Sequence, residues 1–149
     1  MNIWVDADAC PVVIRNILIR ASNRHKIKTT FIANRPLPIQ PSAFVSQWQV
    51  HQGFDEADHE LVRRVSNGDL VVTQDLRLVA DVFGKSAMAL SPRGEWFEPS
   101  TIQSRIARRD YNEVLRDSGV FTAGPTSLSS RDSQNFANNL QRWINQRNG

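Results

Sequence analysis

The sequence predicts an α/β domain, a three-layer sandwich in which helices flank a mostly parallel central sheet. Short apolar runs rich in β-branched residues alternate along the chain with stretches whose apolar residues recur at helical spacing, and this alternation is typical of parallel sheets. The 149 residues fit one domain, residues 1–149, with a core of ordinary size. The sequence contains no internal repeat and no linker that would divide it.

The first half of the chain is expected to supply three strands and two helices. Residues 3–5 and 29–33 are strand-like, and the helical pattern that Pro11 opens lies between them. A proline-rich loop should follow the second strand and lead to a weaker strand at residues 48–50. The next helical pattern ends in a turn, where Asp69 is expected to be an ordinary turn residue.

The second half continues the alternation. Residues 70–73 are apolar and β-branched, as a strand covered on both faces should be. A short helix should end at Gly84, and residues 87–90 are a plausible further strand. Helical patterns then cover residues 101–118, which are rich in arginine, and the region around residues 136–144.

Composition limits the compartment. The single cysteine, Cys10, excludes an internal disulfide, and no Cys/His spacing of a zinc site is present. Charged residues such as Asp6, Asp8 and Arg15 interrupt residues 1–20, which therefore form neither a secretory leader nor an apolar span. We expect a cytoplasmic protein with no membrane partner.

The basic residues favour a phosphate-bearing partner. Arginine supplies 15 of the 18 basic side chains, and its planar fork suits bidentate phosphate contacts better than lysine does. An acidic centre, residues 51–92, lies between two basic flanks. Solvated surface is the alternative explanation for any single arginine, but as a population they indicate RNA or another nucleic acid as a possible partner.

Acidic side chains follow two of the expected strands. Asp6 ends the first strand, Asp8 lies two residues further, and Asp75 comes after the strand at 70–73. Ligands of doubly wound sheets bind at the carboxyl ends of the strands. Asp58, near the start of the central helix, could face the same crevice. Because Mg²⁺ and Mn²⁺ take carboxylate, water and phosphate oxygens, these four residues are candidate metal ligands and catalytic residues.

Each candidate also has a simpler explanation. Asp55 is a natural helix cap, Asp58 would then favour the helix dipole, and Asp75 could cap the next helix. Capping explains one residue at a time, whereas two like charges as close as Asp6 and Asp8 need a cation or hydrogen-bond donors to compensate them. Cys10 has no histidine near it in sequence and is expected to be buried, not nucleophilic.

Four sequence motifs resemble a known family. They are Asp6-Ala7-Asp8-Ala9-Cys10-Pro11-Val12, Ala57-Asp58, Val72-Thr73-Gln74-Asp75 and Pro92-Arg93-Gly94. Over nearly the whole chain the sequence is similar to the uncharacterised bacterial YaiI/YqxD family, which is grouped with PIN-like nuclease domains. The resemblance implies a parallel sheet flanked by helices, with acids at Asp6, Asp58 and Asp75 and Asp8 as a fourth.

The sequence departs from that family's pattern near the last helix. Thr122-Ala123-Gly124-Pro125 stands where Thr-Gly-Gly-Pro is expected, and Asp132-Ser133 where Asp-Arg is expected. A loop at residues 122–132 could still bind phosphate through its amides and Arg131, with Arg93 as a second substrate-phosphate candidate. A plain connecting loop explains these residues equally well.

Three functional hypotheses follow. The first is a Mg²⁺- or Mn²⁺-dependent phosphodiesterase acting on RNA or another nucleic acid, in which bound metal activates water. In the second, Asp6 and Asp8 act as the nucleophile and acid of a haloacid-dehalogenase-like phosphatase, with Asp6 forming a phospho-aspartate. The third is a catalytically silent module that binds a metal or a partner.

Overall fold

A parallel sheet forms the centre of the computed structural model, which describes residues 1–50, 56–120 and 127–147. Its strand order is β3-β2-β1-β4-β5, and every neighbouring pair is parallel. The strands are β1 (Ile3–Asp6), β2 (Thr29–Ala33), β3 (Val45–Gln49), β4 (Leu70–Val72) and β5 (Met88–Leu90). The predicted fold class, a three-layer α/β sandwich, is confirmed.

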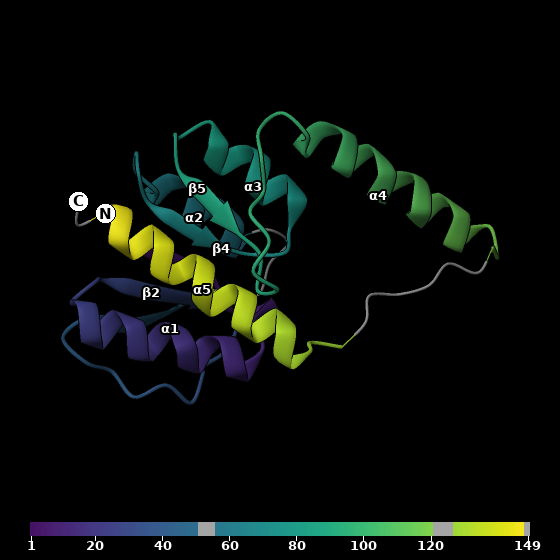
Figure 1. The fold of residues 1–149 in the computed structure, drawn as a ribbon. Coiled ribbons are helices and arrows are strands. Elements are labelled where there is room, and N and C mark those ends of the chain that lie inside the picture. The colour runs from purple at the N-terminus through teal and green to yellow at the C-terminus, as the bar shows by residue number, and fades with distance from the viewer. Residues whose placement is uncertain (51–55, 121–126, 148–149) are drawn as a thin grey trace.

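Helices cover both faces of the sheet (Figure 1). Helices α1 (Val12–His25) and α5 (Ser130–Arg147) lie on one face, whereas α2 (Glu56–Arg64) and α3 (Leu76–Phe83) lie on the other. Helix α4 (Ile102–Asp117) packs on α3 and extends away from the sheet. No helix in the described part of the chain is long and apolar enough to cross a bilayer.

Alternation along the strands builds two cores. In β1, Ile3 and Val5 pack with α1 and α5, whereas Trp4 packs with α2 and α3, as the two-residue period of a strand requires. Every residue of β2 and β4 is buried. This explains why β4, residues 70–72, has no polar side chain.

The connection from β2 to β3 contains no helix, which confirms the proline-rich loop expected after the second strand. Strand β3 begins earlier than residues 48–50, at Val45. It is an edge strand with partly exposed side chains, and its Gln47 holds the preceding loop through two hydrogen bonds with the backbone of Leu37, at 2.8 and 2.9 Å. Such polar edge residues hide a strand from a search for apolar runs.

Two helices differ in detail from the sequence pattern. The apolar pattern that Pro11 opens includes Val12 and Val13, but both are exposed, so the buried stripe of α1 runs through Ile14 and Leu18. Helix α5 begins at Ser130, which places Arg131 in its first turn and not in the preceding loop. The capping role considered for residue 55 lies outside the described residues.

Asp69 is more than a turn residue. Its side chain is buried, and its carboxylate accepts hydrogen bonds from the Trp4 indole and from the backbone amides of Asn2 and Ser66, all at 2.9 Å. A buried carboxylate needs such donors to offset its lost hydration. Asp69 therefore fixes the amino-terminal ends of β1 and β4.

Gly94 allows α5 to approach the loop after β5. Its φ is +85°, and a Cβ at this position would lie 2.4 Å from the backbone nitrogen of Phe136. The Asn139 side-chain amide also donates to the Gly94 carbonyl at 2.6 Å. The Pro92-Arg93-Gly94 motif thus seats the last helix on the sheet.

Candidate functional site

The strand order creates a switch point between β1 and β4. From β1 the chain passes to β2 and β3 on one side of the sheet, and it returns to β4 and β5 on the other. The connections from β1 and β4 therefore diverge at the carboxyl ends of these strands, where ligands of such sheets bind. Asp6 is the last residue of β1, and Thr73 and Asp75 follow β4.

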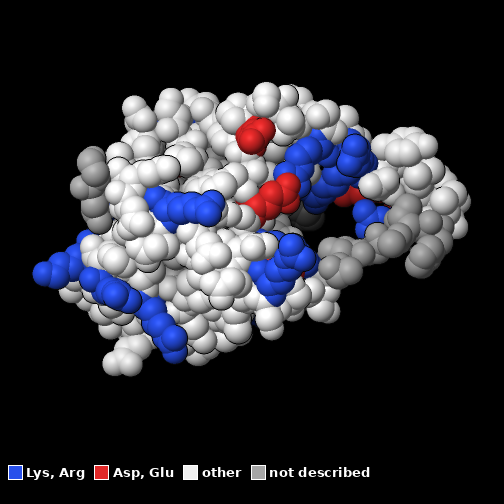
Figure 2. Space-filling model, viewed as in Figure 1, with Lys and Arg blue, Asp and Glu red and all other residues white. Residues whose placement is uncertain are grey.

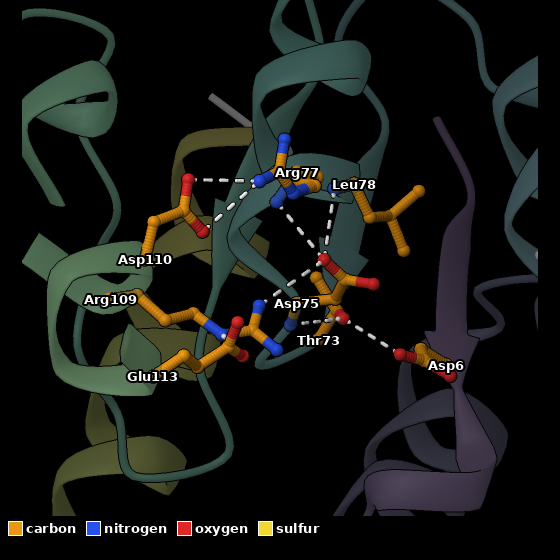
Figure 3. Close-up of polar contacts among 8 residues, drawn as sticks. All are labelled: Asp6, Thr73, Asp75, Arg77, Leu78, Arg109, Asp110 and Glu113. Carbon is orange, nitrogen blue, oxygen red and sulfur yellow. Dashed lines mark hydrogen bonds and ion pairs between the residues drawn. The ribbon is translucent and has the colours of Figure 1, made fainter. Parts of the chain in front are cut away.

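Thr73 links the two strand ends (Figure 3). Its hydroxyl donates to Oδ2 of Asp6 at 2.8 Å, and its oxygen accepts from the backbone amide of Asp75 at 3.0 Å. Thr73 is itself buried. Thr73 thus links the carboxylate of Asp6, at the end of β1, to the backbone of Asp75, which follows β4.

Asp75 has two roles in its immediate surroundings. Its Oδ1 caps α3 by accepting from the amides of Arg77 and Leu78 at 3.0 and 3.4 Å, and Arg109 of α4 forms an ion pair with the same oxygen at 4.0 Å. Arg77 in turn binds both oxygens of Asp110. Asp75 therefore lies at the start of α3, between the end of β4 and Arg109 of α4 (Figure 3).

Asp8 is exposed in the single turn of 3-10 helix that follows β1, η1 (Ala7–Ala9). Its Oδ2 accepts from the backbone amide of Asn34 at 3.0 Å. Asn34 follows β2, and its side-chain oxygen is buried without a hydrogen-bond partner in the described part of the chain. A buried acceptor without a partner is costly, and such an oxygen often marks a place where an ion or water binds.

The surroundings of Asp6 disfavour its negative charge. Burial is the largest cause that raises the pKa of this carboxyl, and the charges of Asp75 and Asp8 raise it further. The hydrogen bond from Thr73 acts in the opposite direction but does not cancel them. Like charges this close favour binding of a cation.

Replacing Asp6 by Asn should stabilise the protein at neutral pH. The pKa of Asp6 is higher in the folded protein than in the unfolded chain. The contribution of Asp6 to the free energy of unfolding is therefore most favourable at pH values below its unfolded-state pKa. This contribution decreases as pH rises through the folded-state pKa. Asn keeps an acceptor for Thr73 but carries no charge. We expect a gain of about 1 kcal/mol at pH near 7.

Urea unfolding at about pH 7 and about pH 3 measures this effect, because the gain should shrink when Asp6 of the wild type is protonated. Asp81→Asn, an exposed acid of α3, is the control. A less stable Asp6→Asn protein at neutral pH would show that this charge supports the fold.

Asp58 lies in the first turn of α2, and its side chain is partly buried. The helix follows β3 and leads to β4, so in a parallel sheet it starts at the carboxyl edge, and it packs against β1 and β2. Within the described ranges, however, no three Asp, Glu, His or Cys side chains form a ready metal centre. The structure brings Asp6 and Asp75 together through Thr73 but does not assemble all four acids into one cluster.

The predicted phosphate-binding residues near α5 are arranged for structure. Arg93 forms an ion pair with Asp132 at 2.9 Å. Asp132 also accepts from the amide of Ser129, whose hydroxyl accepts from the amide of Asp132, so the two residues form a capping box. These contacts lower the pKa of Asp132, led by the hydrogen bond from Ser129. Arg131 is exposed, and residues 121–126 of the loop lie outside the described part.

Cys10 is half-buried and packs against the α1 face of the core. Burial raises the pKa of its thiol to about 12, although Arg15 opposes this. The thiolate needed for nucleophilic attack is therefore scarce at neutral pH.

Sequence reasoning missed Asn34, Thr73 and the role of Arg109. The sequence contains a signal for Asn34, because this polar residue directly follows the buried strand β2. Asp75 likewise comes shortly after the buried strand β4. The β-branched side chain of Thr73 is typical of a strand and gives no sign of a bridging role. Only the packing of α4 on α3 places Arg109 beside the site.

The fold and this arrangement define a three-layer α/β protein with a partly acidic site at the switch point of its sheet. The chain belongs to the YaiI/YqxD family, because residues 4–146 match the family described as "Uncharacterized BCR, YaiI/YqxD family".

Bacterial relatives cover almost the whole chain. A "UPF0178 protein" of Klebsiella pneumoniae (strain 342) is 53% identical over 97% of this chain and 95% of its own length. UPF0178 proteins of Pectobacterium carotovorum (strain PC1) and Yersinia enterocolitica are each 49% identical over 98% of this chain and 97% and 96% of their own lengths. No solved structure matches the chain significantly.

Proposed function

We propose that this protein is a metal-dependent phosphodiesterase, a PIN-like nuclease that acts on RNA or another nucleic acid. The observation that carries the proposal is the Asp6–Thr73–Asp75 bridge at the switch point, where the partly buried carboxylate of Asp6 lies close to the negative charges of Asp75 and Asp8. Arg109 beside Asp75 adds a positive group suited to a phosphate oxygen.

The available donors suit Mg²⁺ or Mn²⁺ bound together with substrate. Mg²⁺ is usually held by one or two carboxylates plus waters and substrate phosphates, so a preformed cluster of three acids is not required. Asp6 and Asp8 would supply carboxylates. Asn34, whose backbone amide contacts Asp8, would supply its Oδ1, which has no hydrogen-bond partner among the described residues. Asp58 and Asp75 are the further candidate ligands.

The bound metal would supply an activated water and polarise the phosphoryl oxygen. The residues of this chain would then orient the reactants. Thr73 fixes one oxygen of Asp6 by hydrogen bonding, and the α3 cap fixes Oδ1 of Asp75, which leaves its Oδ2 available to accept a proton from the attacking water. Water would add to phosphorus, the P–O bond to the leaving nucleoside would break, and the proton would reach that leaving oxygen.

The phosphatase hypothesis receives less support from these contacts. It needs Asp8 to reach the leaving group as a proton donor, but Oδ2 of Asp8 is held by the backbone amide of Asn34 at 3.0 Å. The silent binding module keeps the same acids and metal without turnover. The two alternatives give different results in the experiment below.

The test is hydrolysis of labelled single-stranded RNA, single-stranded DNA and p-nitrophenyl phosphate by purified protein, with Mg²⁺, Mn²⁺ or chelator. We expect RNA cleavage only with metal, and poor turnover of the phosphomonoester. Millimolar metal should also raise the melting temperature, since it binds only the folded state, and Asp6→Asn should abolish that rise.

Other outcomes would overturn the proposal. Phosphomonoester turnover with a trapped acyl phosphate on Asp6 would establish the phosphatase. Metal-induced stabilisation without turnover of any substrate would support the silent module. A melting shift that persists in Asp6→Asn would place the ion elsewhere.

A further inference from the structure

Helix α4 carries a basic stripe that starts beside the candidate site. Its members follow Arg105 at distances of three, four, seven and eleven residues, so they share one face of the helix. This stripe, together with Leu76 of α3, lines a hollow of about 260 Å³. We call it the α4 stripe, and it consists of Arg105, Arg108, Arg109, Asn112 and Arg116.

The positive charge of the α4 stripe is only partly neutralised. Arg105 pairs with Glu95 at 2.9 Å, and Arg109 with Asp75 and Glu113 at 4.0 and 3.6 Å. Arg108 and Arg116 are exposed and form no ion pair with any described residue. In Figure 2, basic side chains gather over the part of α4 nearest the body of the protein. Two arginines therefore remain available to an anionic ligand.

The stripe is continuous with the candidate site. Leu76, which lines the hollow, directly follows Asp75, and Arg109 reaches Asp75 from α4. From Arg108 to Arg116 the helix rises about 12 Å at 1.5 Å per residue. This distance accommodates more than one backbone phosphate, so the stripe suits a polyanion better than a single phosphate group.

An exposed aromatic side chain lies next to the stripe. Tyr111 is 63% exposed. It follows Arg108 by three residues, so at about 100° per residue the two positions are about 60° apart around the helix axis. Nucleobases stack on exposed aromatic rings beside basic grooves, and this requires unpaired bases. Two acids lie among these arginines, and they form ion pairs: Asp110 with Arg77 and Glu113 with Arg109.

We propose that the α4 stripe binds the backbone of single-stranded nucleic acid, with Arg108 and Arg116 contacting separate phosphates and Tyr111 stacking on a base. This inference names the substrate class of the proposed function and rests on that function for its biological meaning. Binding itself needs neither metal nor turnover, and therefore it is measured separately from cleavage.

The experiment measures binding of a fluorescent single-stranded oligonucleotide by anisotropy in the presence of chelator. Arg108→Ala with Arg116→Ala should weaken binding at least about 10-fold at low salt, and should reduce the slope of log K against log salt by about 1.4, or 0.7 per lost phosphate contact. Arg20→Ala with Arg24→Ala on α1 is the matched control, since it removes the same charge from the opposite face.

Tyr111→Ala should weaken binding of the single strand but leave binding of inorganic tripolyphosphate unchanged. All the substituted residues are exposed, and circular dichroism checks the fold. Equal binding by the stripe variant and the wild type would overturn the inference, and so would an equal loss of binding in the α1 control. Tighter binding to duplex or to anionic vesicles than to the single strand would also overturn it.

The result is independent of the proposed function. Metal-dependent cleavage can be observed without binding at the α4 stripe, and binding at the α4 stripe can be observed without cleavage.

Discussion

Replacing Asp75 by Asn should reduce phosphodiester hydrolysis at least about 100-fold, because it removes several kcal/mol of transition-state stabilisation. The carboxylate is the charged partner of Arg109 and the neighbour of Asp6. Asn retains an oxygen for the amides of Arg77 and Leu78 and is as good a helix cap as Asp. The fold should therefore survive while the chemistry is lost.

Cleavage rates of wild type and Asp75→Asn on labelled RNA, with and without chelator, measure this effect. Asp81→Asn is the matched control, because Asp81 is an exposed acid of the same helix. Cleavage that is insensitive to chelator and equal in wild type and Asp75→Asn would reveal a contaminating nuclease. Metal-dependent cleavage at the wild-type rate in Asp75→Asn would remove Asp75 from the mechanism.

Replacing Gly94 by Ala should destabilise the protein by more than about 4 kcal/mol, the range reserved for severe steric or buried-polar defects. The new Cβ would lie 2.4 Å from the nitrogen of Phe136 and 2.5 Å from the carbonyl carbon of Asn135. Both atoms belong to the backbone of α5, so no change of side-chain rotamer can relieve the clash. Helix α5 would have to move off the sheet.

Gly119→Ala separates this clash from backbone strain. Gly119 has φ +86°, nearly the same as Gly94, but among the described residues no atom beyond its two chain neighbours lies within 4 Å of its ideal Cβ. We expect it to cost only about 1–2 kcal/mol, the usual penalty for an alanine in the left-handed region. Denaturant unfolding of both variants measures the difference, and similar losses would show that contact with α5 contributes little.

Much of the fold was accessible from the sequence because it depends on local patterns. The strand at residues 70–73 and the helix after Pro11 are apolar runs of the right period, and the structure places both nearly as expected. Asp6 and Asp75 were predicted at one edge because the carboxyl ends of parallel strands meet there. That inference needs only the strand ends and their parallel direction.

What the sequence did not reveal depends on contacts between distant segments. Strand β3 is stabilised by pairing with β2, which its polar residues do not indicate. The burial of Asp69 arises from Trp4, 65 positions away. The basic character of the α4 residues was visible, but their proximity to Asp75 was not, because it depends on how α4 packs on α3.

The pairing of α1 with α5 over β1 has a consequence for folding kinetics. Ile3 and Val5 share one core with Phe136, Leu140 and Ile144, so this face of the sheet joins segments more than 130 residues apart. Contacts of such high sequence separation form slowly, because the entropy of loop closure is lost before burial compensates for it. The α2–α3 face is built from nearer segments and should gain protection from hydrogen exchange first, with docking of α5 as the late, rate-limiting step.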